Sequence, residues 1–124
     1  MIAWSDLMLP KVLLRGLYEK GFYEPMPIQK LVVPVAIKNK SNIIGTAQTG
    51  SGKTLAFGLP ILTHLIDSFE TNNSGPQALI LTPTRELAIQ IKDHLQICCK
   101  YQKTKVYFIR NLTCHKPKSL LNIK

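Results

Sequence analysis

The amino-acid sequence predicts an α/β fold in which helices flank a mostly parallel sheet. Short apolar runs at 42–45, 78–82 and 105–109 have the length and composition of strands. Segments with apolar residues at helical spacing lie between these runs, and a glycine-rich turn joins the first run to the helix that follows. Strands that alternate with helices are typical of a parallel sheet, because each parallel connection crosses over through a helix.

Composition restricts the class of protein further. A chain of 124 residues has room for one domain, and 16 Lys plus Arg against 7 Asp plus Glu give a formal charge of +9. Such a basic balance favours phosphate-rich partners, although charge alone is equally consistent with a solvated surface. No signal-peptide pattern and no apolar run approaching roughly 20 residues is found, so we expect no membrane association. Three cysteines, with Cys98 and Cys99 adjacent, predict reduced thiols.

Residues 47–54 match the pattern of a phosphate-binding loop that opens a helix. Gly50 and Gly52 permit a tight turn, so that successive N–H groups converge beside a positive helix end. Lys53 is then expected to reach the β- and γ-phosphates, and the Thr54 hydroxyl to ligate Mg²⁺. The alternative is a turn that only connects a strand to a helix. The predicted site consists of Ala47, which replaces the usual glycine, Gln48, Thr49, Gly50, Ser51, Gly52, Lys53 and Thr54.

Two helices are predicted before this loop. The first is expected to end at Gly21 in a left-handed cap, and Pro27 is well placed in the first turn of the second. Pro34 is expected to break or kink the second helix. The apolar faces are Val12, Leu13, Leu14, Leu17 and Tyr18 in the first helix, and Ile28, Leu31, Val32, Val35 and Ala36 in the second.

Two further helices are predicted after the loop, separated by the polar segment 70–77. Pro60 is expected to interrupt the backbone ladder of the third helix, and the fourth is expected to begin at 83–86. The apolar faces are Leu55, Leu59, Leu62, Ile66 and Phe69 in the third helix, and Leu87, Ile91, Leu95 and Cys98 in the fourth.

Three segments, in this order, resemble motifs of the DEAD-box RNA helicases. Residues 21–29, with Trp4 upstream, are similar to the Q motif (4–29). Residues 47–54 are similar to motif I and residues 83–88 to motif Ia. The resemblance covers residues 1–110 and implies the N-terminal part of a first RecA-like ATP-binding domain, a partial P-loop fold. Residues 111–124 are a divergent basic tail.

The resemblance also implies roles for individual residues. Gln29 would read adenine, Phe22 would stack on the purine, and Trp4 would be the isolated upstream aromatic of the nucleotide site. The implied cofactors are ATP and Mg²⁺. The alternative for Phe22 is ordinary core packing, and the alternative for Gln29 is an exposed helical glutamine without a binding role. Met26 stands where the family usually has threonine, so a helix cap worth about 1 kcal/mol is lost and Gln29 is expected to be held more loosely.

RNA is the other implied partner. Pro83, Thr84 and Arg85 would contact its backbone, which gives affinity without sequence preference. A local ion pair with Glu86 is the alternative for Arg85. The pattern at Trp4, Leu7 and Pro10 is similar to a nucleolar subgroup that serves large ribosomal subunit assembly. This implies a nuclear, nucleolar location, with the cytoplasm as the alternative.

Parts of the family pattern are missing. The chain has seven acids, no two of them adjacent, so the Asp-Glu-Ala-Asp motif is absent, as are the Ser-Ala-Thr motif and the second domain. We therefore expect the ATP-binding portion of a helicase, truncated before the Asp-Glu-Ala-Asp motif and inactive alone. In the family's sheet, strands from later in the sequence lie between the strands that correspond to 42–45 and 78–82. Those later strands are missing here. Their absence predicts exposed sheet edges, protein partners at those edges and marginal stability. The alternative function is a non-catalytic RNA- or protein-binding module.

Overall fold

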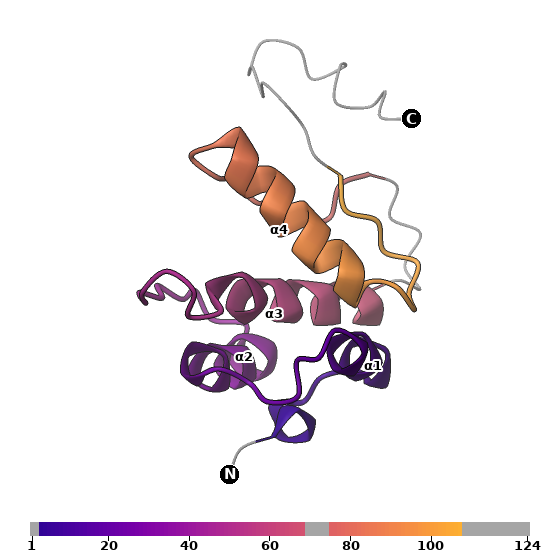
Figure 1. Ribbon diagram of the computed structural model, residues 1–124. Helices are drawn as coiled ribbons and strands as arrows, with labels where there is room; N and C mark the ends of the chain where they lie inside the picture. Colours follow the sequence, from indigo (N-terminus) through magenta and orange to yellow (C-terminus); the bar gives the residue numbers. More distant parts are fainter. Residues whose placement is uncertain (1–2, 69–74, 108–124) are drawn as a thin grey trace.

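The computed structural model describes residues 3–68 and 75–107, which form a short 3₁₀ helix and four α-helices. Figure 1 shows α3 in the middle of the molecule, with α4 crossing one side and α1 and α2 lying on the other. The elements are η1 (Trp4–Leu7), α1 (Lys11–Glu19), α2 (Pro27–Asn39), α3 (Lys53–Asp67) and α4 (Arg85–Cys98). None of these helices has the length and apolarity needed to span a bilayer.

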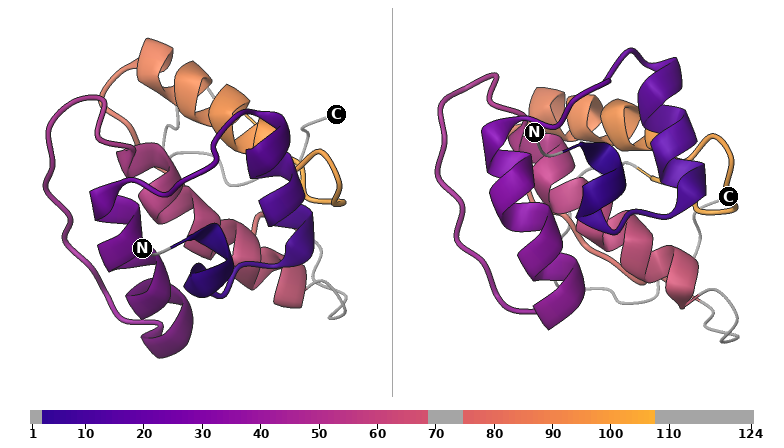
Figure 2. Two further views of the ribbon diagram at one scale, coloured as in Figure 1. Left: turned by 60° about the horizontal axis from the view of Figure 1, so that its bottom comes forward. Right: turned by 90° about the horizontal axis from the view of Figure 1, so that it is seen from below.

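The prediction of a mostly parallel sheet is wrong for this chain, because no described residue belongs to a strand. Segments 42–45 and 78–82 are irregular, and so is the described part of the third candidate, 105–107 (Figure 2). Residues 108 and 109 lie outside the described residues. The sheet edge at which we expected protein partners is therefore absent from the described part of the chain.

The missing sheet has a simple physical cause. A strand persists only if its N–H and C=O groups pair with a neighbouring strand. The side chains of the two irregular segments are correspondingly uncovered: Ile44 is 97% exposed, Leu79 66% and Leu81 77%. The apolar composition of these runs therefore favours a strand, but a strand forms only where a neighbouring strand pairs with it.

The core lies where the four helices meet, and the predicted helical faces supply most of it. Leu13 and Leu17 of α1 are fully buried, as predicted. From α3 and α4 the predicted residues Leu55, Leu59, Leu62, Ile91, Leu95 and Cys98 are also buried. Tyr18 and Leu87, at the edges of their faces, are exposed. Phe69 lies outside the described residues.

The predicted apolar face of α2 is wrong. Leu31 is 73% exposed and Val35 41%, whereas the buried residues are Gln29 and Val33. These two stand one turn apart on the face that packs along α3. The hydrophobic pattern could not identify this face, because one of its two buried residues is the polar Gln29. An amide is buried only when specific hydrogen bonds satisfy it, and the pattern does not report such bonds.

The cap between α1 and α2 is confirmed. Gly21 has a φ of 79°, its N–H donates to Tyr18 O at 3.0 Å, and the N–H of Phe22 donates to Leu17 O at 3.0 Å. This pair of bonds is the Schellman motif, which ends a helix and fixes the direction of the chain beyond it. Phe22 therefore leaves α1 in a defined direction.

The local interruptions of the backbone ladder expected at Pro34 and Pro60 do not end either helix. Each proline lies inside a continuous helix, α2 and α3 respectively. A proline removes one hydrogen bond from the ladder, and here the packing of α2 against α3 keeps both helices intact on either side of it.

Replacing Gly16 with Ala is expected to destabilise the fold. An added Cβ would lie 3.1 Å from Cys98 O and 3.3 Å from Cys98 Cα, so α1 would have to move away from the backbone of α4. Overpacking of this kind costs about 1–3 kcal/mol. Urea denaturation measures the loss.

The matched control is Gly45→Ala, in the irregular segment before loop 47–54. Gly45 is exposed, and an added Cβ would lie 3.7 Å from Cδ1 of Ile28, which is an ordinary van der Waals contact. Equal destabilisation by the two substitutions would contradict the backbone contact at Gly16.

The two described cysteines are confirmed as free thiols. Cys98 and Cys99 are 1% and 2% exposed and form no disulfide. Burial raises the pKa of each thiol to about 11. Both are therefore protonated near neutral pH and act as small apolar core residues.

Candidate nucleotide-binding site

The glycine-rich loop leads directly into α3, which begins at Lys53. Gly50 and Gly52 have φ values of 80° and 85°, in the left-handed region that glycine enters without strain. The N–H of Ser51 donates to Gln48 O at 3.2 Å and closes the turn. The chain therefore turns from the irregular segment into the helix within a few residues, as the phosphate-loop pattern predicts.

The Lys53 ammonium group is folded back over the loop. Its Nζ donates to Ala47 O and, at 3.0 Å, to Gln48 O. Thr54 is half-buried in the first turn of α3, and the Oγ of Ser51 is buried without a partner among the described residues. Thr49 and Gly50 are exposed at the tip of the loop.

Gln29 joins this loop to the start of α2. Its Oε1 accepts from Met26 N at 2.8 Å, and its Nε2 donates to Gly52 O at 3.0 Å. The side chain is 2% exposed and is fixed at both ends, so the expected loosening caused by Met26 is wrong. An amide has a second N–H and a second lone pair, which leaves one donor and one acceptor for another partner.

Gly52 lies against the start of α2. An added Cβ would collide with Nε2 of Gln29 and lie 3.1 Å from Cγ of Met26. Only glycine therefore fits here on two grounds, the left-handed backbone and the lack of space. The sequence pattern identified Gly52 for its turn, whereas its contact with Gln29 required the structure.

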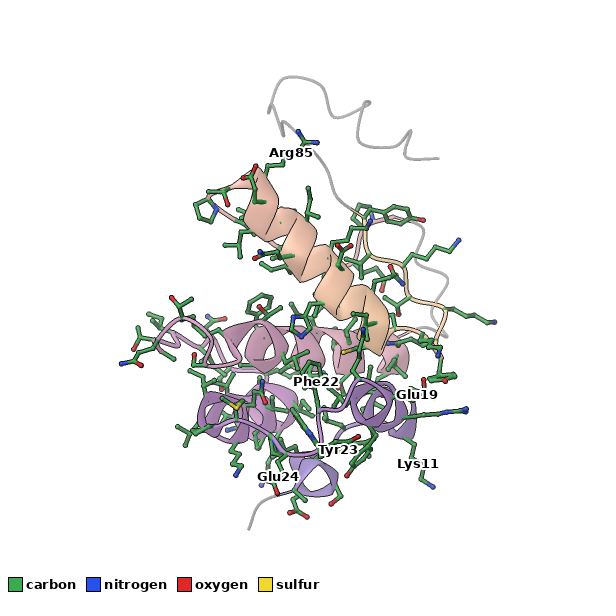
Figure 3. All side chains as sticks on the ribbon, viewed as in Figure 1. Lys11, Glu19, Phe22, Tyr23, Glu24 and Arg85 are labelled. Carbon is green, nitrogen blue, oxygen red and sulfur yellow. The ribbon has the colours of Figure 1, made fainter. Side chains whose placement is uncertain are left out.

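Trp4 and Phe22, the two aromatic residues predicted for the nucleotide site, have different environments. Trp4 is 1% exposed, and its Nε1 donates to Phe22 O at 2.9 Å. Trp4 thus holds the backbone of Phe22 from inside the core. Phe22 is half-buried near the middle of the molecule (Figure 3), where its ring stacks on His94 with centroids 5.6 Å apart and planes 21° from parallel.

Sequence reasoning missed His94 as the partner of Phe22. Burial, followed by the positive charge of Lys20, lowers the pKa of His94, so the imidazole is neutral at pH 7 and stacks as an uncharged ring. No local signal identifies this pair, because a histidine in the middle of a helix has many uses and the contact joins distant parts of the chain.

The three predicted RNA-contacting residues lie together at the start of α4, and all are exposed. Thr84 caps the helix, since its Oγ1 accepts from Leu87 N at 3.2 Å. Figure 3 shows Arg85 projecting from the end of α4. Among the ion pairs of the described residues, none joins Arg85 to Glu86, so the local ion pair considered for Arg85 is not formed.

Comparison with known proteins gives the family. The model described as DEAD/DEAH box helicase matches residues 26–121. The chain belongs to the DEAD/DEAH box helicase family. The resemblance predicted from the Q motif, motif I and motif Ia is therefore confirmed.

Curated relatives of this DEAD-box chain are much longer proteins. It is 41% identical over 139 residues to DEAD-box ATP-dependent RNA helicase 13 of Oryza sativa subsp. japonica, covering 98% of the chain and 17% of the relative. It is 48% identical over 112 residues to ATP-dependent RNA helicase MAK5 of Kluyveromyces lactis, covering 89% of the chain and 14% of the relative. The chain thus spans about a sixth of the length of these relatives.

Solved helicase structures are also similar. The RNA helicase Prp28 from Chaetomium thermophilum bound to ADP has a TM-score of 0.80 at 38% identity, covering 97% of this chain and 29% of that one. S. cerevisiae Dbp5 bound to RNA and ADP BeF3 has a TM-score of 0.73 at 36% identity, covering 82% of this chain and 25% of that one. The helices of this DEAD-box chain are therefore arranged as in part of these proteins.

Proposed function

We propose that this chain is the ATP-binding portion of an ATP-dependent RNA helicase. Loop 47–54 would hold the triphosphate, with Lys53 on the β- and γ-phosphates and Thr54 as a ligand of the Mg²⁺ that accompanies ATP. In a longer protein that carries the remaining motifs of the family, ATP hydrolysis would drive local separation of RNA strands.

The observation that carries this proposal is the bond between Gln29 Nε2 and Gly52 O. This hydrogen bond connects Gln29, which is expected to read adenine, to the loop that is expected to hold phosphate. The groups that would recognise the base and the phosphates of one nucleotide are therefore directly bonded to each other. The remaining N–H and lone pair of Gln29 match the donor and acceptor of the adenine edge. Phe22, held by Trp4, would supply the stacking surface for the purine.

The donor set also fits Mg²⁺ accompanied by phosphate. Magnesium takes oxygen ligands and is usually bound through one or two protein groups together with substrate phosphates. The Thr54 hydroxyl at the start of α3 is such a group. When bound, Mg²⁺ would neutralise charge on the β- and γ-phosphates, while Lys53 exchanges its loop carbonyls for phosphate oxygens.

Hydrolysis by the 124 residues alone is not expected. Phosphoryl transfer needs an acid to hold the metal and a group to orient the attacking water. The Asp-Glu-Ala-Asp motif, which would supply such acids, is missing from these 124 residues. We therefore propose nucleotide binding without turnover for this chain alone.

RNA would bind by its backbone at Pro83, Thr84 and Arg85, where Arg85 is exposed beside a helix N-terminus. One relative is named a pre-mRNA-splicing ATP-dependent RNA helicase. On that basis we propose a nuclear location, including the nucleolus suggested by Trp4, Leu7 and Pro10.

Replacing Lys53 with Ala is expected to weaken ATP binding about 10- to 100-fold, because hydrogen bonds to charged groups contribute about 1.5–3 kcal/mol. Titration calorimetry with ATP and Mg²⁺ measures the affinity. Lys38→Gln, a loss of the same charge at the far end of α2, should leave it unchanged. An unmodified folded chain that does not bind ATP would refute the proposal.

The alternative is a non-catalytic RNA-binding module, favoured by the net charge of +9. It predicts RNA affinity that falls steeply with salt and survives Lys53→Ala. RNA-stimulated ATP turnover by the 124-residue chain would contradict both this alternative and the expected lack of hydrolysis.

A further inference from the structure

A second basic surface lies away from loop 47–54, where α1 meets the segment that follows α4. Figures 1 and 2 show α1 and the loop on opposite sides of the molecule. Residues 11–20 and 99–105 contain a single acid, Glu19, and several cations, all exposed. The cations are Lys11, Arg15, Lys20, Lys100, Lys103 and Lys105.

Arg15 lies against Tyr101 at the centre of this region. Its guanidinium carbon lies 4.0 Å from the centroid of the Tyr101 ring, and its Nε is 3.5 Å from Glu19 Oε1. The Arg15 side chain is nevertheless 65% exposed. The guanidinium group is thus in contact with an aromatic ring while most of the side chain is open to solvent.

Glu19 fixes the aromatic and the second cation around Arg15. Its carboxylate accepts from the Tyr101 hydroxyl and, at 2.9 Å, from Lys100 Nζ. The hydrogen bond from Tyr101, followed by that from Lys100, lowers the pKa of Glu19, so it is ionised at neutral pH. One carboxylate cannot neutralise both cations that contact it, so the surface stays positive.

Lys11 extends the same surface along α1. It stands one helical turn before Arg15, which stands one turn before Glu19, so the three side chains share a face. We call Lys11, Arg15, Glu19, Lys100 and Tyr101 the Arg15 surface. It presents a planar guanidinium cation together with two lysine ammonium groups.

We propose that the Arg15 surface binds single-stranded RNA, with a base stacked on the guanidinium of Arg15 and phosphates paired with Lys11 and Lys100. Unpaired bases stack on arginine planes and aromatic rings, and lysines follow the backbone charge. An acidic peptide would need the cations but not the guanidinium plane. This surface is distinct from Arg85, which lies at the opposite end of α4, a helix of 14 residues and therefore about 20 Å long.

Arg15→Lys tests the stacking, because it keeps the charge and removes the plane. We expect single-stranded RNA to bind the full 124-residue variant about tenfold more weakly, as stacking of one base contributes about 1–3 kcal/mol. Heparin, which has charge but no bases, should bind unchanged. Fluorescence anisotropy measures both affinities, and unchanged RNA affinity would refute the proposal.

A pair of double variants tests the location. Lys11→Gln with Lys100→Gln should lower the slope of log affinity against log salt by about 1.4, at about 0.7 per single-strand phosphate contact. Lys38→Gln with Lys40→Asn removes the same charge from α2, and asparagine tolerates the φ of 49° at residue 40. Equal effects of the two pairs would show that overall charge binds RNA, and the proposal would be wrong.

Far-UV circular dichroism is the folding control. The spectrum should be the same for all variants, so that weaker binding does not reflect unfolding. One further variant separates this proposal from that of the nucleotide site. Lys53→Ala should leave RNA binding at the Arg15 surface unchanged when no nucleotide is present. A polyglutamate chain that competes with RNA equally well in Arg15→Lys and in the unmodified chain would identify an acidic protein partner and overturn the RNA proposal.

Discussion

Gly52→Ala is expected to abolish most nucleotide binding and to destabilise the fold. At a φ of 85°, an alanine costs about 1–2 kcal/mol in backbone strain. Its Cβ would also collide with Nε2 of Gln29, so the bond from that amide to Gly52 O would break. Because this bond joins the two halves of the site, we expect ATP affinity to fall on the order of 100-fold, equivalent to about 2.7 kcal/mol.

Gly50→Ala is the matched control for this substitution. Its φ of 80° imposes nearly the same backbone strain, but an added Cβ meets nothing within 4 Å. The difference in free energy of unfolding between the two variants, measured by urea denaturation, isolates the collision with Gln29. Similar stabilities would show that the loop and α2 are not in tight contact. Titration with ATP then measures the effect on binding.

Gln29→Ala is expected to have the largest effect on stability of the substitutions on α2. It removes a buried side chain and leaves the N–H of Met26 and the C=O of Gly52, both part-buried, without their partner. An unsatisfied group costs about 1–3 kcal/mol when it is fully buried, and less when water reaches it. We therefore expect a loss of about 2–4 kcal/mol, together with loss of the preference for ATP over GTP, because the group that would read adenine is gone.

The control is Gln90→Ala, the same chemical change at an exposed position of α4. It should alter stability by no more than about 0.5 kcal/mol. Thermal denaturation compares the two variants, and ATP and GTP titrations compare their preference for the base. A Gln29→Ala chain as stable as Gln90→Ala would contradict the role of Gln29 as a buried connection between α2 and the loop.

The helices could be predicted from the sequence because their signals are local. Pro27 at the start of α2, Gly21 after α1 and the apolar spacing of α3 each act within a turn or two of the chain. Strands differ, since an apolar run becomes a strand only when another run pairs with it. Residues 42–45 and 78–82 have strand-like composition but are irregular, so the sheet could not be deduced from their composition.

The site could be predicted in its parts but not in its connections. The loop pattern gave Lys53 and Thr54, and family resemblance gave Gln29 and Phe22. The bond from Gln29 to the loop and the stack of Phe22 on His94 join residues far apart in sequence, so no periodicity reports them. The predicted apolar face of α2 was wrong for the same reason. Gln29 is buried because its hydrogen bonds satisfy the amide, whereas the hydrophobic pattern assigns buried positions only to apolar residues.

The contacts of the Lys53 ammonium group have an energetic consequence for the proposed nucleotide binding. Since Nζ already donates to two loop carbonyls, an incoming triphosphate would substitute one set of oxygens for another. The heat of such an exchange would therefore be the difference between binding phosphate oxygens and binding carbonyl oxygens. Selectivity for a triphosphate over a lone phosphate would then depend on how many loop N–H groups the ligand engages at the same time.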